Sequence, residues 1–185
     1  MDSSVNERIE VIRGDITQQR VDAIVNASNP SLLPGTGVCG AIHRAAGHRL
    51  GFDCAKLGGC PRGEAKVTPG HRLFAQYVIH TVGPVWNGGN EKEPEVLASA
   101  YANSLKVASE RGVRTVAFPS ISTGVYGYPV DKASRVAVRT IKGYLEKEPN
   151  IQKVVIVCFT DDDEAEYKQA LREALGGASP ASTMA

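Results

Sequence analysis

Apolar positions along the 185-residue chain follow two alternating periods, one typical of strands and one typical of helices. Short runs of apolar, often β-branched residues predict six strands, over residues 8–13, 21–25, 64–68, 77–82, 115–119 and 153–159. Apolar residues spaced i, i+3, i+4 predict four helices, from Val38 to about Leu50, from Glu95 to Arg111, from Pro129 onward and from Glu164 to Leu175. Strands that alternate with helices in this way predict an α/β domain of three layers.

Other stretches are expected to cap or connect these elements. Residues 51–63 contain several glycines and cysteines and are expected to form a loop. Three consecutive aspartates, Asp161 to Asp163, are expected to cap the last helix. Residues 1–175 are enough for one core and are expected to form a single domain. The small and polar residues 176–185 are expected to form a disordered C-terminal tail.

Composition argues against several classes of protein. A formal net charge of +1 provides no global field that would attract nucleic acid or a membrane surface. No apolar run approaches the ~20 residues of a membrane span, and the N-terminus lacks the features of a signal peptide. The four cysteines form no C-x-x-C motif, so we expect reduced thiols and no metal or cofactor. These features predict a cytoplasmic protein without direct nucleic-acid or membrane partners, and the near-neutral charge favours a monomer.

The main candidate site follows the second predicted strand. Gly35, Gly37 and Gly40 have the spacing G-x-G-x-x-G and lead into the first predicted helix. A glycine-rich turn at a helix N-terminus presents free N–H groups and the positive end of the helix dipole, which bind phosphate. A dinucleotide fingerprint has the same spacing, but eight residues separate the strand from Gly35 and no strand precedes Asp53. We therefore interpret the stretch as a phosphate loop and not as an NAD site.

A second glycine loop, residues 120–128, follows the fifth predicted strand and also precedes a helix. In sheets of this type, ligands bind in the crevice beyond the carboxyl ends of the strands. Two phosphate loops at one crevice predict a pyrophosphate ligand. Asp15 and Phe159 follow the first and last strands, and Asn26 and Asn29 follow the second. Phe159 could stack on a base at one end of the crevice, and the asparagines could bind a sugar at the other.

Five motifs, read in order from about Ile9 to Leu175, resemble the macrodomain family. The resemblance is closest to its MacroD-type ADP-ribosyl hydrolases, which include bacterial O-acetyl-ADP-ribose deacetylases. The motifs are G-D-I-T at Gly14, V-N-A-S-N-P at Val25, G-x-G-V-C-G-A-I-H-R-A-A-G at Gly35, H-T-V-G-P-V-W at His80 and F-P-S-I-S-T-G-V-Y-G-Y-P at Phe118. This resemblance implies a three-layer α/β/α macrodomain with a central mixed six-stranded sheet. It also implies that the ligands are ADP-ribose, its esters and mono-ADP-ribosylated proteins.

The resemblance implies a role for each matching residue. Asp15 would accept a hydrogen bond from the adenine amino group, Ile16 would supply a backbone N–H, and Phe159 would lie against the adenine. Tyr126 would enclose the distal ribose and Asn29 would contact it near the reacting ester. Asn26 either braces the loop or contacts the ligand. Two groups of residues would cradle the phosphates, namely Gly35, Thr36, Gly37, Val38, Cys39 and Gly40, and Ser122, Thr123, Gly124, Val125 and Tyr126.

The sequence departs from the family pattern at three positions. Pro34 and Thr36 stand where close relatives usually carry glycine, which stiffens the first loop. Cys39 stands where hydrolytic relatives usually carry an aspartate that orients or activates water. We interpret the chain as a hydrolase of O-acetyl-ADP-ribose or of mono-ADP-ribose on acidic side chains, with Asn29, Cys39 and Tyr126 as its candidate catalytic residues. Because of Cys39, the alternative is a reader module that binds ADP-ribose without turnover.

Cys39 has one further interpretation, as a nucleophile. His43 lies four residues after it, the spacing that places two side chains on one face of a helix, and cysteine with histidine can support covalent catalysis. The apolar stripe beside His43 instead favours a packing role for that residue. His80 and Cys158 lie within predicted strands and are expected to be structural.

Overall fold

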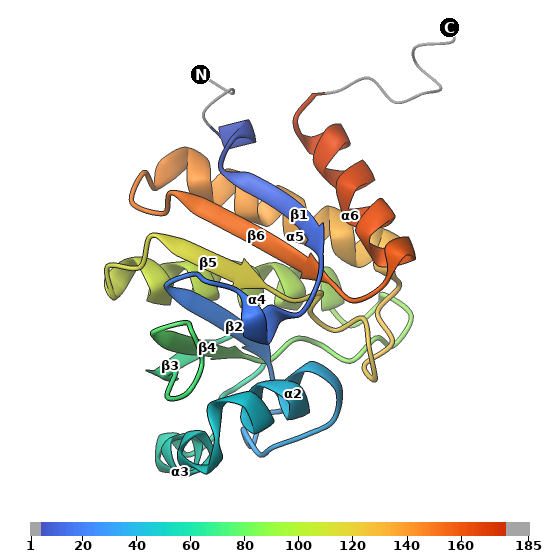
Figure 1. Ribbon diagram of the computed structural model, residues 1–185. Coiled ribbons are helices and arrows are strands. Elements are labelled where there is room, and N and C mark those ends of the chain that lie inside the picture. The colour runs from blue at the N-terminus through green and yellow to red at the C-terminus, as the bar shows by residue number, and fades with distance from the viewer. Residues whose placement is uncertain (1–4, 177–185) are drawn as a thin grey trace, which may run out of the picture.

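The computed structural model describes residues 5–176, which form six strands, five α-helices and one 3₁₀ helix (Figure 1). The strands are β1 (Ile9–Arg13), β2 (Ala23–Ala27), β3 (Ala65–Pro69), β4 (Tyr77–Thr81), β5 (Thr115–Phe118) and β6 (Lys153–Cys158). The helices are η1 (Ile16–Gln18), α2 (Gly37–Ala46), α3 (His48–Leu57), α4 (Glu93–Glu110), α5 (Val130–Lys147) and α6 (Asp161–Ala174). No helix within the described range is long and apolar enough to cross a membrane.

The strands form one mixed sheet in the order β1-β6-β5-β2-β4-β3. Every neighbouring pair is parallel except β3 and β4, which are antiparallel. Asn26 of β2 is in register with His80 of β4, and Ala23 of β2 with Val116 of β5. The carboxyl ends of the parallel strands therefore meet at one edge of the sheet, where the loops after β1, β2, β5 and β6 begin.

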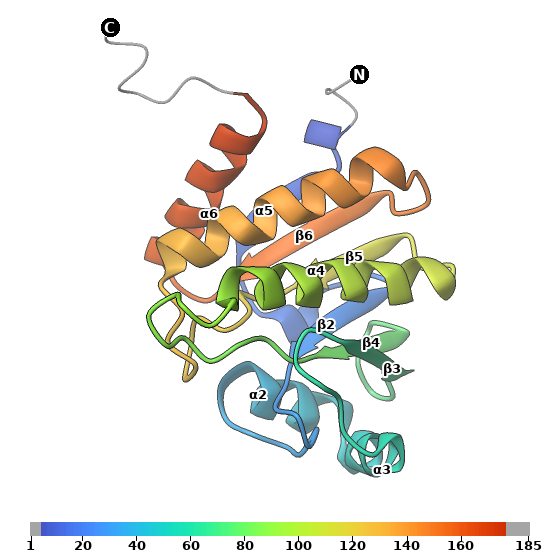
Figure 2. The same cartoon turned by 180° about the vertical axis from the view of Figure 1, so that it is seen from behind.

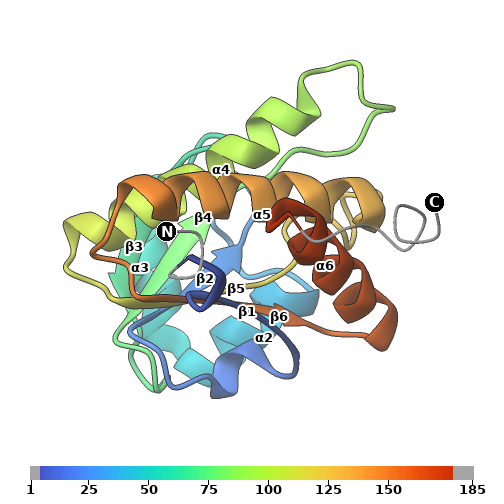
Figure 3. The same cartoon turned by 90° about the horizontal axis from the view of Figure 1, so that it is seen from above.

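Helices cover both faces of the sheet, which confirms the predicted three-layer α/β/α architecture with a mixed six-stranded sheet. Helices α4, α5 and α6 lie on one face (Figure 2), and η1, α2 and α3 lie on the other (Figure 3). One apolar core, which includes Val25, Phe118 and Tyr101, packs between the sheet and the first group. A smaller core, which includes Ile24 and Ile42, packs between the sheet and the second group. Burial on both faces explains why the strands read as continuous apolar runs.

Three expectations about the elements were wrong. The single helix from Val38 to Leu50 is interrupted at Gly47, whose φ of 91° is incompatible with a continuous helix. Residues 48–57 form α3, although residues 51–57 were expected in a loop; this helix was missed because it buries only Leu50 and Cys54 and has no wide apolar stripe. The last helix begins at Asp161, so the three aspartates lie in its first turn. Its N-cap is Thr160, whose hydroxyl accepts a hydrogen bond from the Asp163 N–H at 3.1 Å.

The predicted C-terminal tail falls almost entirely on residues 177–185, which lie outside the described range.

Candidate functional site

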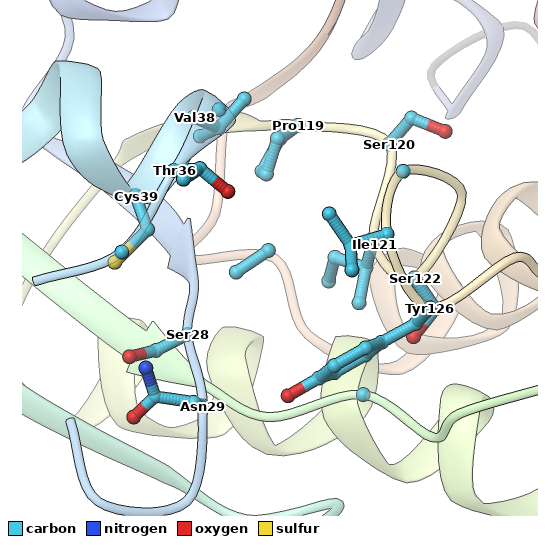
Figure 4. Close-up of a pocket in the computed structure, with 16 residues that line it drawn as sticks. Ser28, Asn29, Thr36, Val38, Cys39, Pro119, Ser120, Ile121, Ser122 and Tyr126 are labelled. Carbon is cyan, nitrogen blue, oxygen red and sulfur yellow. The ribbon is translucent and has the colours of Figure 1, made fainter. Parts of the chain in front are cut away.

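A crevice of about 350 Å³ lies where the loops after β2 and β5 face each other (Figure 4). Ten of the residues predicted for the site line it: Asn29, Gly35, Thr36, Gly37, Val38, Cys39, Ser122, Gly124, Val125 and Tyr126. Six lining residues were not predicted: Ala27, Ser28, Gly83, Pro119, Ser120 and Ile121. No lining side chain is an acid, a histidine, a lysine or an arginine, so an anionic ligand would be bound by backbone N–H groups and neutral side chains.

Asn29 folds the first loop through its side chain. Its Oδ1 accepts hydrogen bonds from the Leu33 N–H at 3.1 Å and the Ser31 hydroxyl at 2.7 Å, while its Nδ2 donates to the Leu33 carbonyl at 3.1 Å. Asparagine commonly closes a turn in this way. The residue expected to contact a ribose therefore also shapes the wall of the crevice.

Helix α2 presents its N-terminus to the crevice. Its N-cap, Thr36, makes no side-chain capping hydrogen bond, and its first turn contains no acidic residue. The first N–H groups of a helix have no partner inside the helix and carry partial positive charge. Gly37, Val38 and Cys39, which begin α2, also line the crevice. This end of the crevice is therefore suited to an anionic group.

The second loop is held in a tight, partly strained conformation. Ser122 has a φ of 68°, which is uncommon for a residue with a side chain. Its carbonyl accepts a hydrogen bond from the Tyr128 N–H at 2.9 Å, and the Gly124 carbonyl accepts from the Gly127 N–H at 2.9 Å. Strain of this kind persists where the surrounding structure fixes the backbone, and it is frequent at functional sites.

Two buried tyrosines support this loop from the core. The Tyr101 hydroxyl accepts a hydrogen bond from the Ile121 N–H at 3.2 Å, and the Tyr167 hydroxyl lies 2.6 Å from the Ser120 hydroxyl. Burial raises the pKa of Tyr101 to about 12, so its hydroxyl stays protonated at neutral pH. These tyrosines come from α4 and α6. They were not predicted because their contacts depend on packing between elements far apart in the sequence.

Arg62 connects the loop before β3 to the crevice. It donates a hydrogen bond to the Gly83 carbonyl at 2.8 Å, and its guanidinium lies 5.1 Å from the centre of the Tyr126 ring. A cation over an aromatic face is stabilising and fixes the orientation of the ring. Tyr126 is also held through its carbonyl, which accepts from the Trp86 N–H at 2.8 Å. Its ring extends toward the segment that carries Ser28 and Asn29 (Figure 4).

Two serine hydroxyls at the crevice have no protein partner. The Oγ atoms of Ser28 and Ser122 are buried and make no hydrogen bond within the described residues. Both serines line the crevice. Buried polar groups are normally satisfied by protein, water or ligand. These hydroxyls are therefore candidates to hold a water molecule or a ligand oxygen.

The Cys39 thiol is buried and takes part in hydrogen bonds. Its sulfur lies 3.7 Å from Asn26 Nδ2 and donates to the Leu33 carbonyl at 3.8 Å. His43 is buried as expected, and its Nε2 has no hydrogen-bond partner within the described residues. Burial lowers the pKa of His43 and favours the neutral imidazole. No Cys39–His43 hydrogen bond is formed, so the arrangement does not support a nucleophilic thiol.

Asn26 and His80 lie behind the crevice. Asn26 belongs to β2, whereas the sequence placed it after the strand, and it is fully buried and does not line the crevice. Its Nδ2 donates to His80 Nδ1 at 3.1 Å. The prediction that His80 is structural is consistent with its full burial in β4, and Cys158 is fully buried in β6.

Four more predicted residues do not line the crevice. Asp15 and Phe159 follow β1 and β6 at the same edge of the sheet, and Asp15 Oδ1 accepts hydrogen bonds from the Thr17 N–H at 2.9 Å and hydroxyl at 2.7 Å. Ile16 is buried, whereas the Phe159 side chain is 83% exposed. Thr123 donates to the Ser120 carbonyl at 3.1 Å. The adenine contacts expected of Asp15, Ile16 and Phe159 stay predictions.

Gly40, the last predicted residue outside the lining, has a structural role. A Cβ atom at this position would collide with the Gly35 carbonyl oxygen, so only glycine lets the first loop fold against α2. Among the missed residues, Ser120 and Ile121 lie within the predicted second loop but were not named as ligand contacts, and Pro119 would have been found by extending that loop back to the end of β5. Gly83 gave no comparable signal, because it lies outside both glycine loops, in the segment that follows β4. In residues 5–176 no cluster of His, Cys, Asp or Glu could hold a metal ion.

Comparisons with known proteins agree with this geometry. A family model described as Macro domain matches residues 25–137. A macro domain-containing protein of Chlorobaculum tepidum is 58% identical over 166 residues, which cover 90% of this chain and 96% of that protein. A Klebsiella pneumoniae protein named O-acetyl-ADP-ribose deacetylase is 51% identical over 166 residues, which cover 88% of this chain and 95% of that protein.

Solved structures show the same fold. The Oceanobacillus iheyensis macrodomain with ADP matches with a TM-score of 0.87 and 38% identity, over 94% of this chain and 95% of that one. The Trypanosoma brucei macrodomain in complex with ADP-ribose matches with a TM-score of 0.84 and 40% identity, over 89% of this chain and 69% of that one.

Proposed function

The chain belongs to the macro domain family, and we propose that its crevice binds ADP-ribose and hydrolyses ADP-ribose esters. The substrates are O-acetyl-ADP-ribose and mono-ADP-ribose attached to acidic side chains of proteins. The observation that carries this proposal is the crevice between the N-terminus of α2 and the strained loop after β5. It is supported by the 51% identical relative named as a deacetylase and by two similar structures solved with ADP and ADP-ribose.

In this proposal the pyrophosphate lies between the two loops. The N–H groups at the start of α2 would donate to one phosphate, and those of residues 122–126 would donate to the other. A hydrogen bond to a charged group contributes about 1.5–3 kcal/mol, so several of them support micromolar affinity without a metal ion. Asn29 and Tyr126 then lie at the distal ribose, and the adenine extends toward Asp15 and Phe159 at the far end of the same edge.

Hydrolysis requires a water oxygen to attack the ester carbonyl carbon and lose a proton. The bond from that carbon to the ribose oxygen then breaks, the ribose oxygen takes up a proton, and a carboxylic acid leaves. The crevice has no carboxylate or imidazole among its lining side chains, and the Cys39 thiol already donates to Leu33. We therefore assign proton acceptance to a phosphate oxygen of the ligand, with Asn29 and the loop backbone positioning the water.

The second candidate function is a reader that binds ADP-ribose and releases it unchanged. Cys39 favours this function, because a thiol cannot act as the carboxylate that hydrolytic relatives use.

A turnover assay separates the two functions. Purified protein is given O-acetyl-ADP-ribose, or a protein mono-ADP-ribosylated on Glu or Asp, and free ADP-ribose and acetate are quantified. We expect release by the wild-type protein and its loss in Asn29→Ala. ADP-ribose affinity is measured on the same samples, because Asn29 also shapes the loop. Tight binding with no release by the wild-type protein would contradict hydrolysis and identify a reader.

The variant Cys39→Asp tests which group limits the rate. If the missing carboxylate limits turnover, Cys39→Asp releases product faster than the wild-type protein. An unchanged rate would instead support proton acceptance by the phosphate. Cys39→Ser serves as the matched control, because a hydroxyl can replace both hydrogen bonds of the thiol without adding a charge.

A further inference from the structure

A chain of buried polar groups runs from the core of the sheet to the first loop of the crevice. It begins at Thr68 of β3 and passes through His80 of β4 and Asn26 of β2 to Cys39 of α2. The successive distances are 2.9 Å from Thr68 Oγ1 to His80 Nε2, 3.1 Å from His80 Nδ1 to Asn26 Nδ2, and 3.7 Å from Asn26 Nδ2 to Cys39 Sγ. The chain ends at the Leu33 carbonyl, 3.8 Å from Cys39 Sγ.

The direction of the hydrogen bonds follows from the last acceptor. The Leu33 carbonyl can only accept, so the Cys39 S–H points to it and the sulfur accepts from Asn26 Nδ2. The other hydrogen of that amide nitrogen then points to His80 Nδ1, which must be unprotonated. The proton of the neutral imidazole is therefore on Nε2 and points to Thr68 Oγ1 at 2.9 Å, which is closer than Cys54 Sγ at 3.7 Å from Nε2 and 4.0 Å from Nδ1. Burial lowers the pKa of His80 to about 4, in agreement with a neutral ring.

The chain is connected to the predicted ligand contacts through Leu33. The same carbonyl accepts the hydrogen bond from Asn29 Nδ2 at 3.1 Å. Asn26 Oδ1 has no partner within the described residues, so hydrogen bonding holds this side chain through Nδ2 only. A change at His80 would thus reach Asn29 through Asn26, Cys39 and Leu33, although His80 is fully buried and does not line the crevice.

We propose that His80 and Asn26 are positioning residues: the Nε2–H tautomer of His80 orients Asn26, which fixes the Cys39 thiol and, through the Leu33 carbonyl, the loop that carries Asn29. This inference rests on the proposed function for its effect on ADP-ribose, but not for the hydrogen bonds themselves. It assigns Cys39 the role of a link between sheet and loop. Neither Asn26 nor His80 needs to touch the ligand for the crevice to depend on them.

Two substitutions of one residue test the proposal. In His80→Asn, the new Oδ1 takes the place of Nδ1 and still accepts from Asn26. In His80→Gln, the new amide nitrogen takes the place of Nε2, so the contact to Thr68 is kept and the acceptor for Asn26 is lost. Both changes remove the ring from the same buried position. The loss of one neutral hydrogen bond is expected to weaken ADP-ribose about fivefold to tenfold in His80→Gln, whereas His80→Asn stays within about twofold of the wild-type protein.

The matched control is His43→Gln, which changes a buried histidine of α2 that takes no part in this chain of hydrogen bonds. It should leave ADP-ribose affinity unchanged. Equal losses in His80→Asn and His80→Gln would overturn the proposal, because a cavity would then explain the effect better than the lost acceptor. A loss in His43→Gln as large as that in His80→Gln would overturn it too.

Two measurements need no ligand, and the first of them uses only the wild-type protein. The ¹⁵N chemical shifts of the His80 ring in the wild-type protein should show a protonated Nε2 and an unprotonated Nδ1; the opposite tautomer would overturn the proposal. Alkylation of Cys39 by iodoacetamide should be faster in His80→Gln than in His80→Asn, and equal rates would count against it. Absence of ADP-ribose binding by the wild-type protein would overturn the proposed function, and these two measurements would still decide about His80.

Discussion

At the scale of the residue, the crevice depends on close backbone approaches as well as on side chains. The first loop packs closely against the start of α2. A Cβ atom on residue 40 would collide with the Gly35 carbonyl oxygen. The glycine spacing predicted a phosphate loop, and Gly35 and Gly37 do line the crevice. The role of Gly40 could not be predicted from spacing, because it depends on how the loop packs against the helix.

The substitution Gly40→Ala should therefore damage the crevice. Its methyl group would collide with the Gly35 carbonyl, and relief of that collision requires the loop to move away from α2. We expect ADP-ribose affinity to fall at least tenfold, measured by isothermal titration calorimetry. Gly143→Ala in α5 is the control, because a Cβ atom there meets nothing within 4 Å and alanine favours a helix by about 1 kcal/mol over glycine. Unchanged affinity in Gly40→Ala would contradict this account of the loop.

The surroundings of Cys39 are a second feature of single residues that the sequence could not provide. The sequence showed a thiol at position 39, where the family resemblance implies an aspartate, and it placed His43 on the same face of the helix. The hydrogen bonds to Asn26 and Leu33 depend on the register of β2 and on the fold of residues 29–33. Packing of this kind decides whether a cysteine is a nucleophile or a link between elements.

At the scale of the element, all six strands were predicted to within two residues of their ends, and the starts of α2, α4, α5 and α6 to within three residues. Strands buried on both faces and helices with wide apolar stripes give strong periodic signals. Helix α3 was missed because its exposed faces outweigh the two residues that it buries. The boundary between α2 and α3 is set by the positive φ of Gly47, and the spacing of apolar residues gives no information on that angle.

One acidic side chain organises the loop before α4. Glu93 accepts hydrogen bonds from the backbone N–H groups of Asn87 at 2.9 Å, Gly89 at 2.8 Å and Glu91 at 2.6 Å. Burial alone would raise the pKa of this carboxyl. The backbone hydrogen bonds outweigh that effect and lower the pKa to about 2. The loop directly follows Trp86, whose N–H donates to the Tyr126 carbonyl.

We therefore expect Glu93→Gln to loosen residues 87–91, since an amide has one acceptor oxygen where the carboxylate has two. Amide hydrogen exchange at Asn87, Gly89 and Glu91 should become faster, while exchange in the centre of α4 stays unchanged. Glu95→Gln, in the same first turn, is the control. Unaltered exchange in Glu93→Gln would show that the loop is held in another way.

At the scale of the whole molecule, the core contains two buried histidines, His43 of α2 and His80 of β4, that stay uncharged in the folded protein. Both His43 and His80 have a pKa lowered by burial, and that of His80 falls from 6.5 to about 4. The unfolded chain therefore binds more protons than the folded chain between these two values. The contribution of the neutral His80 ring to the free energy of unfolding is fully present above about pH 6.5. It is lost as the pH falls toward 4, which lowers the free energy of unfolding by about 3 kcal/mol.

Urea unfolding at several pH values tests this expectation. The free energy of unfolding of the wild-type protein should fall between pH 6.5 and 4.5 more steeply than that of His80→Asn, which lacks the titrating ring. The two proteins share all other histidines and carboxylates, so the difference between their slopes isolates His80. Parallel slopes would mean that His80 is not held neutral in the folded protein.

The order of the strands explains how the site is assembled from distant segments. Residues after β1, β2, β5 and β6 meet at one edge because these strands are parallel and lie next to one another in the sheet. An alternating α/β pattern was enough to predict a crevice at this edge. Its supporting contacts from Arg62, Tyr101 and Tyr167 depend on packing across the whole domain and could not be predicted.

The central claim is that the crevice between the α2 N-terminus and the loop after β5 binds ADP-ribose. Isothermal titration calorimetry of the wild-type protein with ADP-ribose tests it most directly. We expect one site per chain with a dissociation constant in the micromolar range, because several backbone N–H groups would donate to the two phosphates. No detectable binding at millimolar ADP-ribose would contradict the assignment of the crevice.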